Sequence, residues 1–354
     1  MRVVIVGATG NIGTSLVEAL GHDREVTSIL ALSRRRPSWR PAKTTWATVD
    51  ITHGDLVHQF RGADAVVHLA WIFQPTHDPV RTWRTNVLGS LRVFEAVAEA
   101  GVPALVHASS VGAYAPGPQR GFVDETWPTH ALPTAAYGRE KSYLERALDT
   151  FELEHPRVRV VRLRPGFIFK HSAAPEQRRL FAGPLIPGFL VRPSLVPVVP
   201  DLPGLRFQAL HSFDAAEAFR RAVVGEVRGA FNVAAEPVLD ARTLADLLGA
   251  RVVRVPRGLV RSLVATAWHL HAVPASPTLL DLALSLPAMD VTRARTELGW
   301  QPTMSSLDAV TAFLQGLRAT TGGPTPPLRA DAGGPLRWRE VATGVGQRDR
   351  LDPR

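Results

Sequence analysis

Residues 3–13, which read VVIVGATGNIG, carry the strongest structural signal in the chain. The β-branched run predicts a buried strand, the glycines are spaced GxxGxxG, and residues 12–20 have the apolar spacing of a helix. A glycine turn between strand and helix lets backbone N–H groups approach a pyrophosphate, and the helix N-terminus adds partial positive charge. The expected contacts of a bound dinucleotide are Gly7, Thr9, Gly10, Asn11, Ile12 and Gly13.

The pattern that begins in this stretch continues to residue 165. Short β-branched runs at 3–6, 26–32, 45–49, 65–69, 104–108 and 158–163 alternate with helical patterns at 12–20, 56–60, 85–100 and 136–150. Strands that alternate with helices at this spacing form a parallel sheet covered on both faces. The fold class is therefore α/β, a Rossmann-type doubly wound parallel sheet with a smaller C-terminal α/β region.

The chain changes character after residue 165. Proline and glycine become frequent, although helical patterns recur at 215–224 and 307–317 and a strand at 230–233. We assign residues 1–165 to a dinucleotide-binding domain and 166–318 to a substrate-binding region interleaved with the edge of the sheet. Residues 319–354 are rich in glycine and proline and lack periodicity, so we expect a disordered tail.

The end of the second strand discriminates between NAD and NADP. NAD enzymes usually place an acidic residue there for the ribose 2′-hydroxyl, whereas this chain has three consecutive arginines beginning at Arg34. Guanidinium groups suit a 2′-phosphate, so NADP is the preferred cofactor, NAD is the alternative, and Arg34 is the main contact. Further contacts are expected after the third strand, at Asp50 and Ile51, and after the fourth, at Leu69 and Ala70.

A tyrosine and a lysine stand at positions i and i+4, as Tyr137 and Lys141, so they share one face of a helix. An ammonium beside a phenol lowers the pKa of the phenol towards working pH, which suits general acid–base chemistry. The same ammonium can hydrogen-bond the nicotinamide ribose, so both residues are also cofactor contacts. The fifth strand ends near Ser110, where a hydroxyl would face the ligand crevice.

These motifs resemble the extended short-chain dehydrogenase/reductases, also called the NAD-dependent epimerase/dehydratase family. The resemblance runs from residue 2 to about 317, through the segments GATGNIG at 7–13, HLA at 68–70, NVLG at 86–89, ASSVGAY at 108–114, YGREK at 137–141, RPG at 164–166, HSFD at 211–214 and RTELGW at 295–300. It implies hydride transfer, with Tyr137 as general acid/base, Lys141 as modulator of its pKa and Ser110 as catalytic serine. It adds Asn86 and Pro165 to the expected cofactor contacts.

Departures from the family pattern narrow the chemistry. The 4,6-dehydratases carry an Asp-Glu pair just after the catalytic hydroxyl, and no such pair follows Ser110 here. Many nucleotide-sugar epimerases contact the pyrophosphate with an Asn shortly after the sixth strand, and the stretch after Arg164 lacks this Asn. These epimerases also carry an Arg-Asp pair just before the His-x-x-Asp segment, and Arg206, the nearest arginine here, is out of register with that pair. The expected pocket wall is aromatic instead, with Trp71, Phe73, Tyr114 and Phe167 as substrate contacts. We expect an oxidoreductase for a small, fairly apolar carbonyl compound or alcohol; a nucleotide-sugar epimerase is the runner-up.

Composition restricts the remaining classes. The chain has no cysteine, no apolar run long enough for a membrane span and scattered basic residues despite a net charge of +9, so we expect a cytoplasmic protein that binds neither nucleic acid nor membrane. No metal site is expected. A cofactor-sensing regulator remains a less favoured alternative because such proteins typically lack the Tyr-Lys pair. The resemblance is compatible with a homodimer formed through the helices at 85–100 and 136–150.

Overall fold

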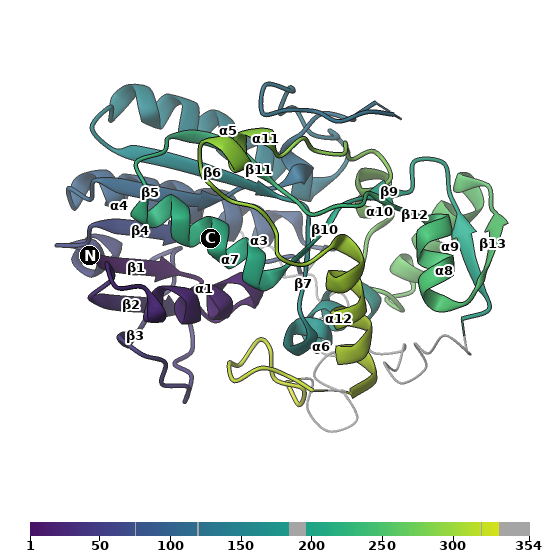
Figure 1. Cartoon of the computed structure of the whole chain (residues 1–354), viewed down its shortest axis with the longest axis horizontal. Helices are drawn as coiled ribbons and strands as arrows, with labels where there is room; N and C mark the ends of the chain where they lie inside the picture. The colour runs from purple at the N-terminus through teal and green to yellow at the C-terminus, as the bar shows by residue number, and fades with distance from the viewer. Residues whose placement is uncertain (75, 119, 184–195, 320, 333–354) are drawn as a thin grey trace, which may run out of the picture.

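The fold is built on one parallel sheet of seven strands in the order β11-β6-β5-β4-β1-β2-β3 (Figure 1). The computed structural model describes residues 1–74, 76–118, 120–183, 196–319 and 321–332. The strands of the sheet are β1 (Arg2–Val6), β2 (Ser28–Ser33), β3 (Thr44–Thr48), β4 (Ala65–His68), β5 (Ala104–Ala108), β6 (Arg159–Pro165) and β11 (Gly229–Val233). This confirms the expected Rossmann-type α/β fold. Successive strands are added outward from β1 to β3 on one side and from β4 to β11 on the other, so the strand order reverses between β1 and β4.

Both faces of the sheet are buried because alternate side chains enter different cores. In β1, Val3 and Ile5 belong to one hydrophobic core, whereas Val4 and Val6 belong to the other. The first core is shared with the helices α1 (Asn11–His22) and α7 (Ser212–Val224), which pack together (Figure 1). The second is shared with α2 (Leu56–Phe60), α4 (Gly89–Glu99) and α5 (Ala136–Glu154).

The helix expected over residues 85–100 is longer and less regular than its pattern indicates. It begins as α3 (Pro79–Trp83), with the Asp78 side chain accepting a hydrogen bond from the Arg81 N–H, and passes through a π-helical turn at Arg84–Leu88 into α4. A π-helical turn inserts an extra residue and redirects the side chains near it. Here that turn carries Asn86, whose side chain is hydrogen-bonded to α5.

The C-terminal region adds short strand pairs and helices at the carboxyl end of the sheet. The pairs are β7 (Phe167–Phe169) with β10 (Ala209–His211), β8 (Val198–Asp201) with β13 (Arg251–Arg254), and β9 (Arg206–Phe207) with β12 (Leu239–Asp240). The helices there are α6 (Ala174–Gln177), α8 (Ala241–Leu248), α9 (Arg257–His269), α10 (Pro277–Ala283) and α12 (Ser306–Ala319), whereas α11 (Thr292–Thr296) lies beside the edge strand β11. Because β11 and α7 complete the sheet and its cover, this region shares one core with the segment 1–165.

The expectation of a disordered tail over 319–354 is wrong for the part that the structure describes. The segment 321–332 is packed against the body of the protein, with Leu328 and Thr325 fully buried. Its proline and glycine content favours tight turns, and a turn that buries one leucine can be ordered without any periodic pattern. Residues 320 and 333–354 lie outside the described residues.

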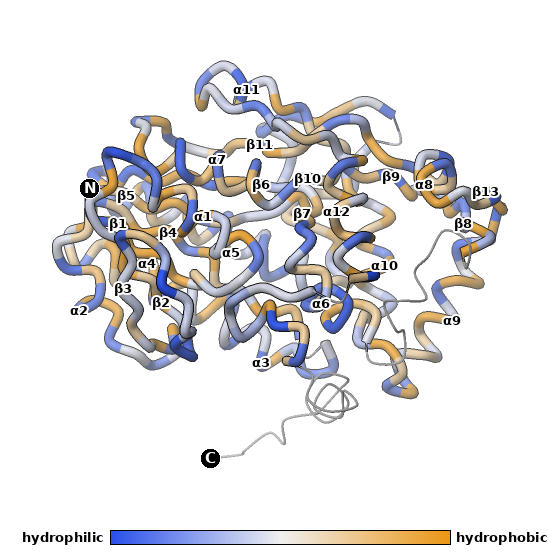
Figure 2. Tube along the Cα trace, turned by 60° about the horizontal axis from the view of Figure 1, so that its bottom comes forward, coloured by the Kyte–Doolittle hydropathy of each residue, from blue (hydrophilic) through white to orange (hydrophobic). Residues whose placement is uncertain are grey.

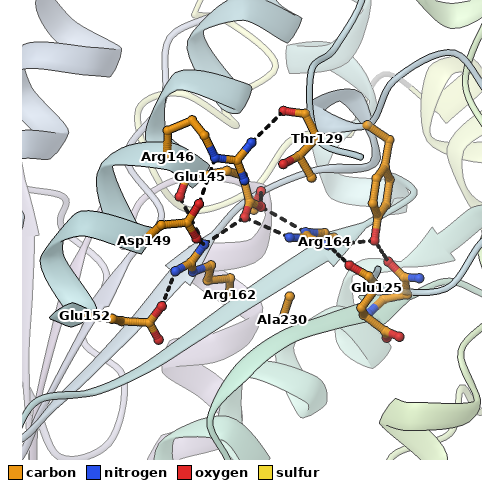
Figure 3. A network of polar contacts seen from close by, with 12 residues as sticks. Glu125, Thr129, Glu145, Arg146, Asp149, Glu152, Arg162, Arg164 and Ala230 are labelled. Carbon is orange, nitrogen blue, oxygen red and sulfur yellow. Dashed lines mark hydrogen bonds and ion pairs between the residues drawn. The ribbon is translucent and has the colours of Figure 1, made fainter. Parts of the chain in front are cut away.

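A buried ionic network ties α5 to the sheet (Figure 3). Glu145 of α5 accepts two hydrogen bonds from Arg164 of β6, at 2.9 and 2.8 Å, and one from Arg162 at 3.2 Å. All three side chains are buried, and Ser109, after β5, also donates to Glu145. Burial alone would raise the pKa of Glu145, but the hydrogen bonds and charge of Arg164 lower it to about 2.

Replacing Glu145 with alanine would leave two buried guanidinium groups without their shared carboxylate. We expect Glu145→Ala to lower the free energy of unfolding by about 3–5 kcal/mol, measured by urea denaturation at pH 7. The control is Glu152→Gln, which removes a partly exposed partner of Arg162 and should cost less than about 1 kcal/mol. Equal losses in the two variants would contradict the assigned role of Glu145.

Candidate active site

The glycine turn brings backbone close to backbone, as a dinucleotide site requires. Gly7 has φ +91°, and a Cβ on it would lie 2.6 Å from the backbone nitrogen of Ala70 just after β4. A Cβ on Gly13 would lie 2.4 Å from the Gly7 carbonyl oxygen. Glycine is therefore required at both positions. The α1 helix begins directly after the turn without a side-chain cap, so its first N–H groups are available to a ligand.

Beside these groups lies a cavity of about 1080 Å³ between the carboxyl ends of the strands and the C-terminal region. It begins at the glycine turn, passes Tyr137 and continues towards α10 and α12. The predicted site residues that line it are Gly7, Thr9, Gly10, Asn11, Ile12, Gly13, Arg34, Asp50, Ile51, Leu69, Ala70, Trp71, Phe73, Ser110, Tyr137, Lys141, Pro165 and Phe167. A second hollow of about 430 Å³ is lined by Arg34 and Asp50 as well. Motifs from the start and the middle of the chain thus share one cavity.

The tyrosine is buried against a serine and a glycine. The Ser110 side chain, which accepts from the Gly112 N–H at 2.9 Å, lies close enough to the Tyr137 hydroxyl to lower the pKa of that hydroxyl. A Cβ on Gly112 would lie 2.7 Å from the Tyr137 ring, so only glycine leaves room for the ring there. Burial raises the pKa of Tyr137 to about 12. The expectation that this pKa is lowered towards working pH is therefore wrong for the protein without ligand, because burial outweighs the opposing effect of Ser110, and the hydroxyl keeps its proton over the whole physiological range.

The lysine is held one turn further along α5. The Lys141 ammonium donates to the Ala108 carbonyl at 2.8 Å and lies 3.5 Å from the centre of the Trp71 ring. Burial lowers the pKa of Lys141 to about 7, although Glu140 and Glu145 oppose this shift. A cation that is so poorly solvated is ready to pair with a developing anion or with polar groups of a ligand.

Aromatic rings cover the tyrosine on its cavity side. Phe73 stacks on Tyr137 with ring centres 5.1 Å apart and an angle of 12° between the planes. Trp71 meets the same ring edge-on at 5.6 Å, and Phe181 meets Phe73 edge-on at 5.4 Å. The tyrosine therefore borders an apolar compartment of the cavity.

Two residues predicted from the sequence lie elsewhere. Tyr114, a predicted substrate contact, is buried; its hydroxyl donates to Asn232 and accepts from Arg164, and it does not line the cavity. Asn86, a predicted cofactor contact, uses its amide to hold both backbone groups of Ile72 and donates to Glu140 at 2.7 Å. Both side chains stabilise the walls of the cavity, because their polar groups are already satisfied by the protein.

Most of the compartment beyond the tyrosine has no counterpart in the sequence predictions. Its walls come from α9, α10 and α12. Figure 2 shows apolar residues along α9 and α10. The added apolar lining residues are Leu180, Val264, Leu279, Leu280, Leu282, Ala283, Leu286, Phe313 and Leu317. They carry no motif, so no local pattern distinguishes them from ordinary core residues.

One carboxylate also lines the cavity without having been predicted. Glu176 of α6 borders this space, and burial raises its pKa to about 7 while the charges of Arg179 and Lys170 act in the opposite direction. Lys170 itself lies against the first turn of α1, donating to the Asn11 carbonyl and to the Thr14 and Ser15 hydroxyls. It brings a positive charge close to the place where the helix start would receive a phosphate.

Two kinds of feature are missing from the part of the chain that the structure describes. No helix there is long and apolar enough to cross a bilayer. Nor do three or more histidine, aspartate or glutamate side chains come together there as a metal site.

Known proteins share the sequence pattern over much of the chain. A model of the NAD dependent epimerase/dehydratase family matches residues 3–234. An uncharacterized protein of Mycobacterium tuberculosis is 27% identical over 91% of this chain. The chain spans only 31% of the length of that relative.

Solved structures resemble the fold over most of the chain. The UDP-glucose 4-epimerase of Thermotoga maritima, determined with UDP-glucose, has a TM-score of 0.68 at 19% identity, over 90% of this chain and 99% of that one. The UDP-glucose 4-epimerase of Thermus thermophilus, determined with NAD, has a TM-score of 0.66 at 22% identity, over 90% of this chain and 99% of that one. At this identity the likeness shows the fold.

Burying the Lys141 charge costs stability. The cost applies fully below pH 7 and shrinks as the pH rises from about 7 to 10.5, where the unfolded lysine also loses its proton. We expect Lys141→Met to raise the free energy of unfolding by about 1–4 kcal/mol at pH 6, with the gain lost near pH 10. Urea denaturation across this range measures it.

The control for this prediction is Lys43→Met, at an exposed lysine. Surface substitutions of this kind have small effects, so its free energy of unfolding should follow the parent at both pH values. A Lys141→Met variant that is less stable than the parent at pH 6 would contradict the argument.

Proposed function

The chain belongs to the NAD dependent epimerase/dehydratase family, and we propose that it is an NAD(P)-dependent oxidoreductase for a small, fairly apolar substrate. Hydride would pass to or from a carbonyl or alcohol carbon, with Tyr137 as general acid/base. The observation that carries the substrate class is the apolar compartment that begins directly at Tyr137, between Phe73 and the residues of α10.

The residues present fit a dinucleotide. The close approach of Gly7 to Ala70 leaves a cradle, and Asn11 keeps a buried side-chain oxygen with no protein partner at the start of α1. The first N–H groups of α1 would hold the pyrophosphate, while Leu69, Ala70 and Pro165 would line the path towards Tyr137. When bound, the nicotinamide supplies or accepts the hydride.

Proton transfer would be carried out by the chain's own residues. In the reducing direction, the Tyr137 hydroxyl donates its proton to the substrate oxygen as the carbonyl carbon gains hydride. Ser110, whose side chain lies beside that hydroxyl, would stabilise the negative charge that develops on the oxygen. The Lys141 ammonium favours the tyrosinate that remains, and in the oxidising direction this tyrosinate takes the proton back.

The compartment beyond Tyr137 supports an apolar substrate more than a nucleotide sugar. Phe167 occupies the stretch in which the expected pyrophosphate-binding asparagine is missing, and it lines the cavity. Arg206 lies outside that lining and donates to the Pro118 and Gly121 carbonyls. Arg34 and Arg35 line the cavity at the end of β2. Away from that end, Arg178 is the one arginine among the described lining residues, and it donates to the Gly183 carbonyl at 2.7 Å.

A nucleotide-sugar epimerase is the second candidate. It is favoured by the solved structures of similar fold, among them the Thermotoga maritima enzyme determined with UDP-glucose. Both candidates use the same tyrosine, so they differ in the ligand that occupies the compartment. Turnover of a panel of apolar ketones and secondary alcohols, run beside UDP-glucose and UDP-N-acetylglucosamine, separates them. Turnover of the UDP-sugars alone would replace the first proposal by the second.

We also propose that two copies of the chain form a homodimer through α4 and α5. Three large apolar side chains on or beside these helices, Leu88, Tyr143 and Leu153, are exposed, the last by 83%. Trp83 packs edge-on against Tyr143 at 5.1 Å, which joins α3 and α5 into one apolar surface. Packing two copies of this surface would bury these side chains in a bundle of four helices.

Tyr137→Phe removes the proton donor and keeps the ring between Phe73 and Gly112. We expect turnover of the best substrate to fall by at least about 100-fold, since general acid–base catalysis contributes that much, while NADPH affinity stays within about threefold. Steady-state rates and nicotinamide fluorescence measure the two. Tyr143→Phe, on the exposed face of the same helix, should change neither value. Parent-like turnover by Tyr137→Phe would refute the assignment.

Arg34 and Arg35 line the cavity where β2 ends, and Asp50, whose carboxylate accepts from Thr52, lies beside Arg34. We propose that Arg34 binds a 2′-phosphate, which makes NADP the preferred cofactor. Arg34→Ala should weaken NADPH binding about tenfold and leave NADH binding unchanged, as measured by fluorescence titration. Arg36→Ala, outside the cavity lining, serves as the control. Tighter binding of NADH than NADPH by the parent chain would overturn the preference.

A further inference from the structure

The segment 321–332, which we call the C-terminal strap, lies beyond the part of the chain that the family model matches. The strap turns back on itself, with the Gly323 N–H donating to the Leu328 carbonyl at 2.8 Å and the Leu328 N–H donating to the Thr325 carbonyl at 3.0 Å. A Cβ on Gly322 would lie 2.2 Å from the Ala330 nitrogen, so the turn is tight. The strap is therefore a defined structure with a fully buried leucine at its centre.

One side of the strap binds the glycine turn. The buried Thr325 hydroxyl donates to the Thr9 carbonyl at 2.7 Å. The same peptide unit carries the Gly10 N–H, which donates to the Gly7 carbonyl at 3.2 Å. The Thr9–Gly10 peptide is thus held at both ends, and it is the last peptide before the N–H groups that open α1.

The other side of the strap binds a second segment that borders the cavity. Arg179, in the π-helical turn Arg178–Ala182 that follows α6, donates to the Pro327 carbonyl and, at 3.3 Å, to the Arg329 carbonyl. Pro327 itself lines the cavity, together with Thr9 and Gly10. The strap therefore joins two segments that border the cavity, the glycine turn and the turn after α6.

We propose that the C-terminal strap is a third wall of the dinucleotide site, with Thr325 as the residue that positions the glycine turn. This inference rests on the proposed dinucleotide binding. A turn that is already held in its binding conformation loses less entropy when it receives a pyrophosphate. Because changes at a binding site act mostly on the dissociation rate, loss of this support should appear mainly as faster release of the dinucleotide.

The test uses three variants of the full chain. Thr325→Val keeps the shape of the side chain and removes the donor, Thr325→Ser restores the donor, and Thr321→Val makes the same change at an exposed strap threonine whose hydroxyl contacts His171. Nicotinamide fluorescence gives the affinity for NADPH and for NADH, stopped-flow displacement gives the release rate, and thermal unfolding without cofactor gives stability.

We expect Thr325→Val to weaken binding of both dinucleotides about 5- to 10-fold, mainly by faster release, because a buried carbonyl loses its hydrogen bond. Thr325→Ser and Thr321→Val should stay within about twofold of the parent. If Thr325→Val binds and releases dinucleotide like the parent, the strap inference is overturned while the proposed function stands. The same holds if Thr325→Val and Thr321→Val lose affinity equally. If the parent binds neither dinucleotide, both proposals are overturned.

Discussion

The buried carboxylate of Glu145 holds together the elements that form the candidate reacting centre. It joins α5 to β6 through Arg162 and Arg164, and it joins α5 to the end of β5 through Ser109. The same helix carries the tyrosine and lysine, and the same strand end carries the serine that contacts the tyrosine. A single buried acid therefore sets the distance between these elements, and its two arginines keep it charged.

A second constraint operates at the glycine turn, where the dinucleotide would bind. The glycine turn approaches the end of β4 so closely that side chains are excluded at Gly7, and this closeness creates the cradle at the start of α1. The C-terminal strap then closes over the turn through Thr325, which links the end of the described chain to its beginning. The close approach of Gly7 and the hydrogen bond from Thr325 both act on the backbone of the turn, so they are independent of which substrate occupies the compartment.

The compartment itself is built differently from the cofactor half. Its aromatic rings Trp71 and Phe73 come from the loop after β4, and its aliphatic walls come from helices of the C-terminal region. An apolar wall excludes water from Tyr137 and Lys141, and this desolvation moves the pKa values of both groups away from the charged forms. The walls that support the proposed apolar substrate therefore also shift the pKa of Tyr137, the proposed proton donor.

The features that could be predicted from the amino-acid order alone depend on short-range geometry: the strand–turn–helix at residues 3–13, the parallel sheet, and the pairing of Tyr137 with Lys141 on one helix face. Long-range packing settled which polar groups were already satisfied, and it removed Tyr114 and Asn86 from the site. It also brought Leu279 and Phe313 to the cavity and Thr325 to the glycine turn. No local pattern marks these residues as part of a site, because contacts between segments far apart in the chain arise from packing and leave no periodicity of their own in the sequence.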